Sequence, residues 1–330
     1  MCSRIKDFIQ LLDFPMTDLI FKDIELSDSK WIRELFSVPD YNSEDYNFTF
    51  QFLWKNTFRS KVARIGDLVL IQYNMDGRKS YLTPVGKADE HQVADIINSM
   101  LNENSLLGDD GRLVFYGVLP SQMDFFEKNF AGRYTSEQIR MGADYIYDAQ
   151  ALKTLSGKKY QAKRNFANGF RRLYRWRFEP ICESNMEECL QMNDEWCRRN
   201  GCGQDFWKNN EFCAVRVALK NYKALDLDGG LLRVDGNVVA FTIGERASSD
   251  TLLVHIEKAL TEYRGAYQAM SQEFLGYMDG VLRQRESIPE GTPAFTLVNR
   301  EDDSGDENLR KAKMEYHPIE IKEKYLVFLK

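Results

Sequence analysis

The chain has 330 residues, more than one ordinary compact domain needs and a comfortable length for two. Hydrophobic residues make up 43% and aromatic residues 13%, which excludes wholesale disorder. The net charge of −6, from 44 basic and 50 acidic residues, argues as an average against a nucleic-acid binder. No run approaches the ~20 apolar residues of a membrane span, and the first residues lack the apolar core of a signal peptide. We therefore expect a cytoplasmic protein without a transmembrane segment.

The first 150 residues alternate between short strand patterns and amphipathic helix patterns. Asp28 offers an N-cap for the first helix, and glycine-containing turns separate the three central strands. The expected elements are a strand over 18–26, a helix over 28–38, an aromatic stretch over 46–58 whose later half has helical spacing, strands over 61–65, 68–73 and 80–85, a helix over 89–102, a strand over 112–119, a helix over 121–130 and a strand over 143–147.

A second series of elements begins after residue 150. Asp235-Gly236-Asn237 predicts a hairpin turn in its middle, and Gly265 begins the longest helix. The expected elements are a strand over 174–178, helices from 184 to 196 and over 206–219, strands over 230–234, 238–243 and 251–258, a helix from 265 to 282, a strand over 294–298, a helix over 307–314 and a terminal strand over 319–329.

Both series share one order: a strand, two helical segments, a three-strand meander, a long helix, a strand, a short helix and a strand. This order resembles that of the GNAT acyltransferase fold. We therefore predict an α+β protein with two tandem GNAT-like domains, each a mixed sheet flanked by helices, over residues 1–150 and 151–330.

Cysteine and histidine spacing argues against a bound metal. Five of the six cysteines lie between Cys182 and Cys213 without a Cys-x-x-Cys pair, whereas structural zinc favours closely spaced ligand pairs. The three histidines are far apart in sequence. We expect reduced thiols buried on helices and no metal site.

The most informative stretch is Lys153 to Arg177, with nine basic residues, no acidic residue and interleaved aromatic residues. Cations can neutralise phosphates while aromatic rings anchor the segment or stack on bases. The alternative is a solvated basic helix whose aromatic residues belong to the core. We interpret the segment as a surface for an anionic ligand, at the start of the second domain.

A second group of candidates lies around residues 253–268. Strand alternation predicts that His255 and Glu257 share one face. Gly265 begins a helix, whose free N–H groups suit an anion or a polarised carbonyl. GNAT enzymes hold the coenzyme A pyrophosphate at this junction, but here Glu262 and Tyr267 depart from their pattern, which argues against acyl-CoA. A structural His–Glu pair is the competing interpretation.

The third candidate stretch, 298–316, is an acidic loop that leads into a basic helix. Acids near a helix start and cations later also suit the helix dipole, so stability alone can explain part of the pattern. The spacing of a calcium-binding loop is absent.

Together these stretches resemble the phosphatidylglycerol lysyltransferase C-terminal domain family, which is related in fold to the Fem aminoacyltransferases. The resemblance spans roughly residues 18–330, and its specific residues lie in the second half. They are Lys163-Arg-Asn-Phe-Ala-Asn-Gly-Phe170, Val254-His-Ile-Glu-Lys258, Tyr263-Arg-Gly-Ala-Tyr-Gln268, Asn299-Arg-Glu-Asp302 and Leu309-Arg-Lys-Ala-Lys313.

The resemblance implies an acyltransferase that moves an aminoacyl group from aminoacyl-tRNA to a lipid or small-molecule acceptor by direct attack, with stabilisation of the oxyanion. Three sets of residues are expected to form the site. The catalytic set is His255, Glu257, Arg264, Lys311 and Lys313; the donor-binding set is Lys163, Arg164, Asn165, Arg171, Arg172, Gly265 and Gln268; the substrate-binding set is Asn299, Arg300, Glu301 and Arg310.

Two alternatives stay open. One is acyl-CoA-dependent N-acetylation of a small amine or peptide; the other is a catalytically degenerate GNAT-like pair that serves as a binding module. The expected donor is an aminoacyl-tRNA or a similar activated acyl group, with acyl-CoA as the alternative. The acceptor and the oligomeric state cannot be read from the sequence.

Overall fold

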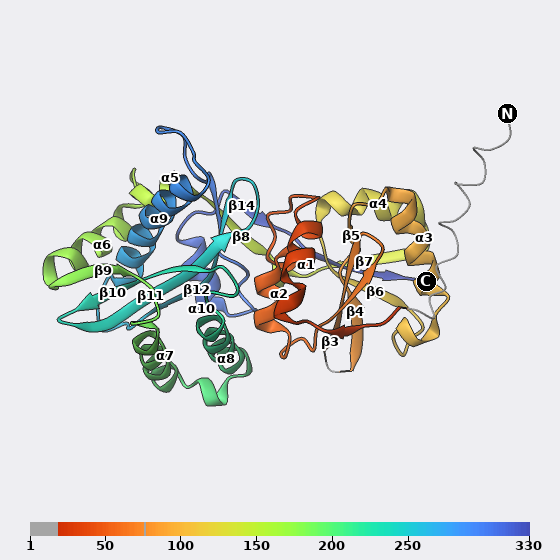
Figure 1. Ribbon diagram of the computed structural model, residues 1–330, viewed down its shortest axis with the longest axis horizontal. Helices are drawn as coiled ribbons and strands as arrows, with labels where there is room; N and C mark the ends of the chain where they lie inside the picture. The colour runs from red at the N-terminus through yellow and green to blue at the C-terminus, as the bar shows by residue number, and fades with distance from the viewer. Residues whose placement is uncertain (1–18, 76) are drawn as a thin grey trace.

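The computed structural model describes residues 19–75 and 77–330. Two lobes lie side by side, each built on one mixed sheet (Figure 1). The first sheet has the order β1-β2-β3-β4-β6-β15-β7, with β5 paired to β3. Its strands are β1 (Lys22–Asp23), β2 (Lys61–Ile65), β3 (Leu68–Met75), β4 (Arg78–Tyr81), β5 (Val85–Gly86), β6 (Leu113–Val118), β7 (Tyr134–Gln138) and β15 (Tyr325–Leu329).

The second sheet has the order β14-β8-β13-β12-β11-β10-β9. Only β12 and β13 pair in parallel; their three-residue pairing ends at Leu253 and Asn299. The strands of this sheet are β8 (Asp144–Asp148), β9 (Trp176–Pro180), β10 (Asp228–Val234), β11 (Asn237–Arg246), β12 (Thr251–Ala259), β13 (Leu297–Asn299) and β14 (Glu320–Lys322).

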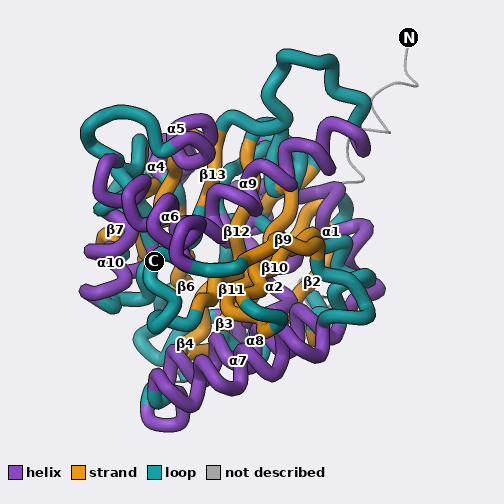
Figure 2. The backbone as a smooth tube through the Cα atoms, turned by 90° about the vertical axis from the view of Figure 1, so that its left-hand side faces the viewer, coloured by secondary structure: helices purple, strands orange, loops and turns teal. Residues whose placement is uncertain are grey.

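Helices cover both sheets. In the second lobe α5, α6 and α9 lie on one face of the sheet, and α7 and α8 lie on the other (Figures 1 and 2). The helices are α1 (Ser29–Phe36), α2 (Phe48–Trp54), α3 (Glu90–Leu101), α4 (Pro120–Phe130), α5 (Ala149–Thr154), α6 (Gln161–Leu173), α7 (Met186–Asn200), α8 (Phe206–Lys220), α9 (Ala266–Arg285) and α10 (Glu307–Met314). No helix in residues 19–75 or 77–330 is long and apolar enough to cross a membrane.

Local sequence signals explain where several helices begin. Asp89 and Gln92 form a reciprocal capping box at the start of α3. The Asp306 carboxylate accepts hydrogen bonds from the first free N–H groups of α10. These signals account for the close agreement between expected and observed bounds in both helices.

The two sheets exchange strands across residue 150. β8 precedes this position but belongs to the second sheet, whereas β15, at the end of the chain, lies between β6 and β7 of the first sheet. The domain boundary at residue 150 stays a prediction. Each sheet, however, contains strands from both sides of this position. A buried core also continues from one lobe into the other, from Ile71 on β3 to Phe241 on β11.

Several expected elements differ from those observed. The strand predicted over 18–26 is reduced to β1, with Asp18 outside the described residues. The terminal strand predicted over 319–329 is two strands, β14 and β15, which separate at Glu323 and Lys324 and join different sheets. The prediction of reduced thiols is wrong for Cys197 and Cys202, because the structure joins them in a disulfide. Cys182 and Cys213, expected to be buried, are exposed.

Candidate active site between the two sheets

His255 lies on β12 at a β-bulge. Ile243 of β11 pairs with Ile256 and Gly244 pairs with Val254, so His255 has no partner across the ladder. The prediction that His255 and Glu257 share a face is wrong, because an extra residue in a strand reverses the alternation beyond it. Accordingly, Val254 and Ile256 belong to different core clusters.

The His255 ring is held between two carboxylates. Its Nδ1 lies 2.8 Å from Glu301 Oε1, and its Nε2 lies 3.0 Å from Glu245 Oε1. Glu245 also accepts a hydrogen bond of 2.6 Å from Arg33 Nη1 and one of 3.0 Å from Asn47 Nδ2. The side chains of His255 and Glu245 are 1% and 5% exposed. The cluster therefore joins β11 and β12 to the first lobe.

Charge in this cluster is balanced. Burial lowers the pKa of His255, but the hydrogen bonds to Glu245 and Glu301 outweigh it and raise this pKa to about 9. Burial raises the pKa of Glu245, but His255 and Arg33 outweigh it and bring this pKa down to about 2. At neutral pH both imidazolium N–H groups donate to carboxylates. This arrangement gives no support to the predicted role of His255 as a base.

A second buried cluster surrounds Lys324, in the linker between β14 and β15. Its ammonium lies 3.0 Å from Glu44 Oε1, 2.6 Å from Asp45 Oδ2 and 2.5 Å from Asp144 Oδ1. All four side chains are at most 3% exposed. Burial, together with the neighbouring Asp144, raises the pKa of Glu44 and raises that of Asp45 to about 6, against the opposing effect of Lys324. Three carboxylates therefore share one cation.

A cavity of about 30 Å³ adjoins the Lys324 cluster. The carboxylates of Glu44, Asp45 and Asp302 line it, so both halves of the chain contribute. Burial raises the pKa of Asp302 as well. The remaining lining is mostly aromatic and consists of Phe50, Phe58, Tyr73, Met75, Ser80 and Tyr116. This cavity, with an acidic floor and aromatic walls, is our candidate active site.

Lys313 fixes the loop that carries Asp302. Its ammonium donates to the carbonyl oxygens of Arg300 at 2.5 Å and Glu301 at 3.2 Å, and to that of Asp302. The Asp302 N–H in turn donates to Glu44 Oε2 at 3.2 Å. Burial lowers the pKa of Lys313. Lys313 therefore positions the loop, and its own donors are already used.

Two of the predicted substrate-binding residues connect the clusters. Asn299 Nδ2 donates to Asp144 Oδ2 at 2.9 Å, and the N–H of Glu301 donates to Asn299 Oδ1 at 2.7 Å. Arg300 instead faces the other core, where its Nη2 donates to Glu257 Oε2 at 2.8 Å. The structure thus brings together His255, Asn299, Glu301 and Lys313, and places the Glu257–Arg300 pair behind them.

The other predicted catalytic residues lie away from the cavity. Arg264 is exposed, with its guanidinium 5.0 Å from the Phe166 ring centre, and Lys311 is exposed on α10. Arg310, from the predicted substrate-binding set, donates to both carboxylate oxygens of Asp303, at 2.8 and 3.0 Å. Gly265 has a φ of +91°, and a Cβ there would lie 2.2 Å from the Phe166 carbonyl oxygen, so α6 packs directly on the start of α9.

The predicted donor-binding residues lie on and around α6. Lys163 pairs with Glu315 at 2.7 Å and Arg171 pairs with Glu273 at 2.7 Å. Arg164 donates to the carbonyl oxygens of Leu155 and Gly157. Asn165 is exposed and Gln268 is partly buried. Within the described residues, Lys158, Lys159, Arg172 and Arg175 are exposed and form no ion pair.

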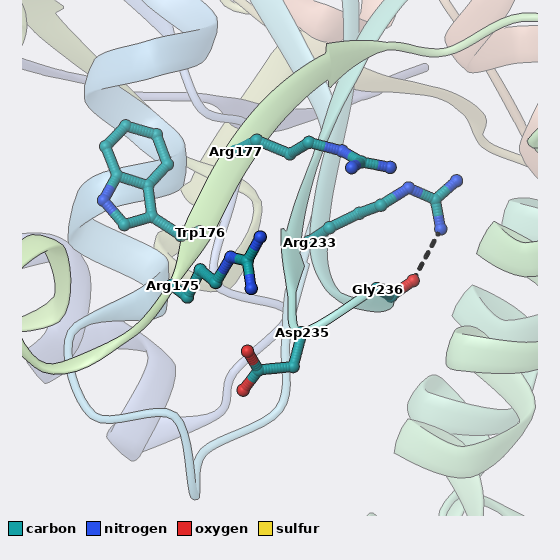
Figure 3. Close-up of a pocket in the computed structure, with 6 residues that line it drawn as sticks. All are labelled: Arg175, Trp176, Arg177, Arg233, Asp235 and Gly236. Carbon is teal, nitrogen blue, oxygen red and sulfur yellow. Dashed lines mark hydrogen bonds between the residues drawn. The ribbon is translucent and has the colours of Figure 1, made fainter.

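The basic segment ends in a surface hollow of about 500 Å³ (Figure 3). Arg175, Arg177 and Arg233 line it, and Arg233 also donates to the Gly236 carbonyl oxygen at 3.1 Å. Glu179 pairs with both Arg177 and Arg233, at 2.5 and 2.8 Å. Glu188 also pairs with Arg233, so two of the three arginines in the hollow already have acidic partners.

Comparison with known proteins agrees with this architecture. The model of the family "Phosphatidylglycerol lysyltransferase, C-terminal" matches residues 37–328. A conserved protein of unknown function from Bacteroides thetaiotaomicron is 35% identical, with a TM-score of 0.83 over 94% of this chain and 100% of that one. The chain therefore belongs to the phosphatidylglycerol lysyltransferase C-terminal family, as its sequence predicted.

More distant structures share the fold. L-PGS from Bacillus licheniformis is 16% identical, with a TM-score of 0.61 over 93% of this chain and 92% of that one. FemX is 10% identical, with a TM-score of 0.54 over 94% and 98%. These likenesses confirm the predicted tandem GNAT-like fold. The curated relative that matches, an uncharacterized protein from Mycoplasmoides gallisepticum, is 25% identical over 194 residues; the match spans 56% of this chain and 55% of that protein.

Proposed function

We propose that the chain is an aminoacyltransferase that takes an aminoacyl group from an aminoacyl-tRNA and transfers it to a hydroxyl or amine of a lipid or small-molecule acceptor. Family membership points to acyl transfer. The observation that supports an aminoacyl donor is the excess of buried carboxylates at the cavity between the two halves.

An ammonium group is the ligand that this cavity suits best. Buried carboxylates without enough cations are costly, and a ligand ammonium beside Asp45 and Asp302 would offset that cost. Rings such as Tyr73 and Phe58 also attract cations to their faces. Every aminoacyl ester carries an α-ammonium group when protonated, whereas an acetyl group carries none. The charge of the cavity therefore favours an aminoacyl donor over acetyl-CoA.

The cavity residues also suit direct transfer. The acceptor oxygen or nitrogen attacks the ester carbonyl carbon, the new bond forms, and the bond to the ribose oxygen then breaks. Asp302, which lines the cavity, is the carboxylate that we propose takes the acceptor's proton and returns it to the leaving ribose oxygen. Burial raises the pKa of Tyr116, so its phenol stays protonated and serves as a donor to the oxyanion.

The cavity as described is smaller than a whole aminoacyl ester. A volume of about 30 Å³ holds little more than one small polar group. Entry of the ester therefore requires one wall to move. Among the aromatic residues of the wall, Phe58 packs against Trp207 of the second lobe, with 6.3 Å between the ring centres.

Transfer from aminoacyl-tRNA tests the proposal directly. Asp302→Asn should lower the rate by about 10²-fold or more, because it removes the proposed base. Glu307→Gln also replaces a carboxylate by an amide, at an exposed position of α10. It should retain wild-type activity and serves as the matched control. Equal rates for wild type and Asp302→Asn, or no transfer with any aminoacyl-tRNA and acceptor lipid, would contradict the proposal.

Binding of tRNA is expected at the unpaired cations around α6. Replacing Lys158, Lys159, Arg172 and Arg175 by alanine should weaken tRNA binding by about tenfold or more at low salt and reduce its salt dependence. The charge-matched control replaces Lys30, Lys61, Lys220 and Lys223, four exposed lysines elsewhere, by alanine. Equal losses in the two variants would show that only net charge matters.

Binding of acyl-CoA is disfavoured by the contact between α6 and α9. The Phe166 carbonyl oxygen occupies the space beside Gly265, where GNAT enzymes leave room for the pyrophosphate. Calorimetric titration with acetyl-CoA should therefore give no heat of specific binding. Micromolar affinity would favour acetyl transfer instead.

A further inference from the structure

The connection between α7 and α8 contains a cysteine pair that the proposed reaction does not use. Cys197 lies near the end of α7 and is partly buried, and Cys202 is buried in the short 3₁₀ helix Cys202–Gln204. A disulfide joins them, and their two Cα atoms lie 5.2 Å apart. Turn hydrogen bonds also hold the connection: the N–H groups of Gly201, Gln204 and Asp205 donate to the carbonyl oxygens of Cys197, Gly201 and Cys202, respectively. The Lys208 N–H donates to Asp205 Oδ1.

The residues that follow this connection touch a wall of the cavity. Trp207, in the first turn of α8, packs against Phe58 at 6.3 Å between ring centres. Phe58 packs edge-on to Tyr73 at 5.8 Å, and Tyr73 packs edge-on to Tyr116 at 5.7 Å. One helical turn after Trp207, Asn210 Oδ1 accepts a hydrogen bond from the Thr57 hydroxyl at 3.0 Å.

We propose that Cys197 and Cys202 form a reversible thiol–disulfide pair that sets the position of the cavity wall through Trp207 and Phe58. Its consequence for substrate binding rests on the proposed function. The physical basis is a contiguous chain of packed rings, which starts at Trp207, five residues after Cys202, and runs through Phe58 and Tyr73 to the cavity.

Thiol–disulfide exchange with a small disulfide such as glutathione disulfide can oxidise the cysteine pair. The accessible Cys197 thiolate attacks one glutathione sulfur and releases the first glutathione thiolate. The Cys202 thiolate then displaces the second glutathione from the mixed disulfide. The protein pair is oxidised by two electrons, glutathione disulfide is reduced to two glutathione molecules, and both released thiolates take up the protons that the cysteines lost.

The reduced pair should loosen the connection. Without the bridge, residues 201–206 depend on isolated turn hydrogen bonds, and Trp207 has more freedom against Phe58. The reduced form should therefore have a more mobile wall, and the oxidised form a more rigid one.

The first experiment follows the disulfide itself. The full chain is equilibrated with glutathione buffers of different redox ratios, alkylated and mapped by mass spectrometry. We expect an internal Cys197–Cys202 disulfide that forms and disappears with the ratio, in the wild type and in Cys213→Ser alike. Cys213 is exposed on α8 and is the matched control. Failure of the internal disulfide to form, or glutathione retained on Cys197, would overturn the inference.

The second experiment measures coupling without any ligand. Hydrogen exchange of the Phe58 amide, which bonds to the Trp54 carbonyl oxygen, should be about fivefold or more slower in the oxidised form. Cys197→Ser should match the reduced wild type, and Trp207→Ala should remove the difference while Trp207→Phe keeps it. Equal exchange in oxidised and reduced wild type would overturn the coupling, even if the disulfide forms.

Binding of alaninamide distinguishes this inference from the proposed function. Affinity should change by about fivefold or more between the two redox forms. If neither form binds alaninamide, the proposed function fails, and the exchange measurement alone decides the inference. If both forms bind it equally, the inference fails and the proposed function stands.

Discussion

The two buried polar clusters between the lobes differ in charge balance. Around His255, the imidazolium and Arg33 face Glu245 and Glu301, so two cations meet two carboxylates. Around Lys324, one ammonium faces three carboxylates, and a cavity adjoins them. The Lys324 cluster is the more buried of the two, with side chains at most 3% exposed against 14% for Glu301 and 32% for Arg33, and only it has unmatched charge.

This difference indicates a structural role for the His255 cluster and a ligand-binding role for the Lys324 cluster. A balanced, fully hydrogen-bonded cluster fixes the lobes relative to one another and needs no ligand. In the Lys324 cluster, burial and the neighbouring Asp144 both raise the pKa of Glu44 and Asp45, whereas in the His255 cluster burial raises the pKa of Glu301 against the opposing effect of His255. Raised carboxyl pKa values beside a cavity are common at sites that bind or catalyse. Three changes test whether the two clusters really divide these roles.

Removing Lys324 should have the largest effect. Lys324→Met leaves three buried carboxylates without a cation, and we expect a loss of about 3–5 kcal/mol in the free energy of unfolding at neutral pH. The loss should shrink as pH falls, because the carboxylates then become neutral. Urea denaturation across pH measures it, with Lys322→Met, a neighbouring lysine paired with the exposed Glu320, as the control. A loss below 1 kcal/mol would mean that the cluster is not buried as described.

Removing the charge of His255 should have a smaller, pH-dependent effect. Its pKa is raised from 6.5 to about 9, so the folded state favours the imidazolium. The resulting stabilisation, about 3 kcal/mol, is fully present below pH 6.5 and is lost as pH rises towards 9. His255→Gln should lack this pH dependence. Parallel stability profiles for wild type and variant between pH 6.5 and 9 would contradict the balanced-cluster interpretation.

The smallest effect is expected for ligand binding at Asp45. The pKa of Asp45 is raised to about 6, so the carboxylate is neutral below that pH and charged above it. Affinity for alaninamide should rise by up to about tenfold per pH unit below pH 6 and level off above it. Calorimetry from pH 5 to 7, a range in which the α-amino group of alaninamide stays protonated, measures this profile. Asp45→Asn should flatten it, and an unchanged profile in the variant would remove Asp45 from the site.

The sequence predicted the fold well and the site only in part. The order of elements and the residues 299–302 indicated the family, and His255, Asn299, Glu301 and Lys313 do meet. Residue types do not reveal the β-bulge at His255. The prediction that Glu257 lies on the same face of the strand as His255 was therefore wrong. The helices α5 and α6 and the strand β7 were also absent from the expected elements.

The carboxylate cluster was not predicted because its members come from distant segments. Glu44 and Asp45 directly precede the aromatic stretch, Asp144 lies on β8, and Lys324 lies near the end of the chain. Only the exchange of β8 and β15 between sheets brings them together. Lys324 gave no separate signal, because Glu320, Lys322 and Glu323 beside it are charged as well.

The central claim is that the cavity binds an ammonium group, and a pair of small ligands tests it most directly. Calorimetry should show that alaninamide binds the wild type and that propionamide, which has the same shape without the ammonium, does not bind measurably. Asp302→Asn should weaken alaninamide by about tenfold or more, because a charged hydrogen bond is lost. Equal binding of the two amides by the wild type would contradict the account.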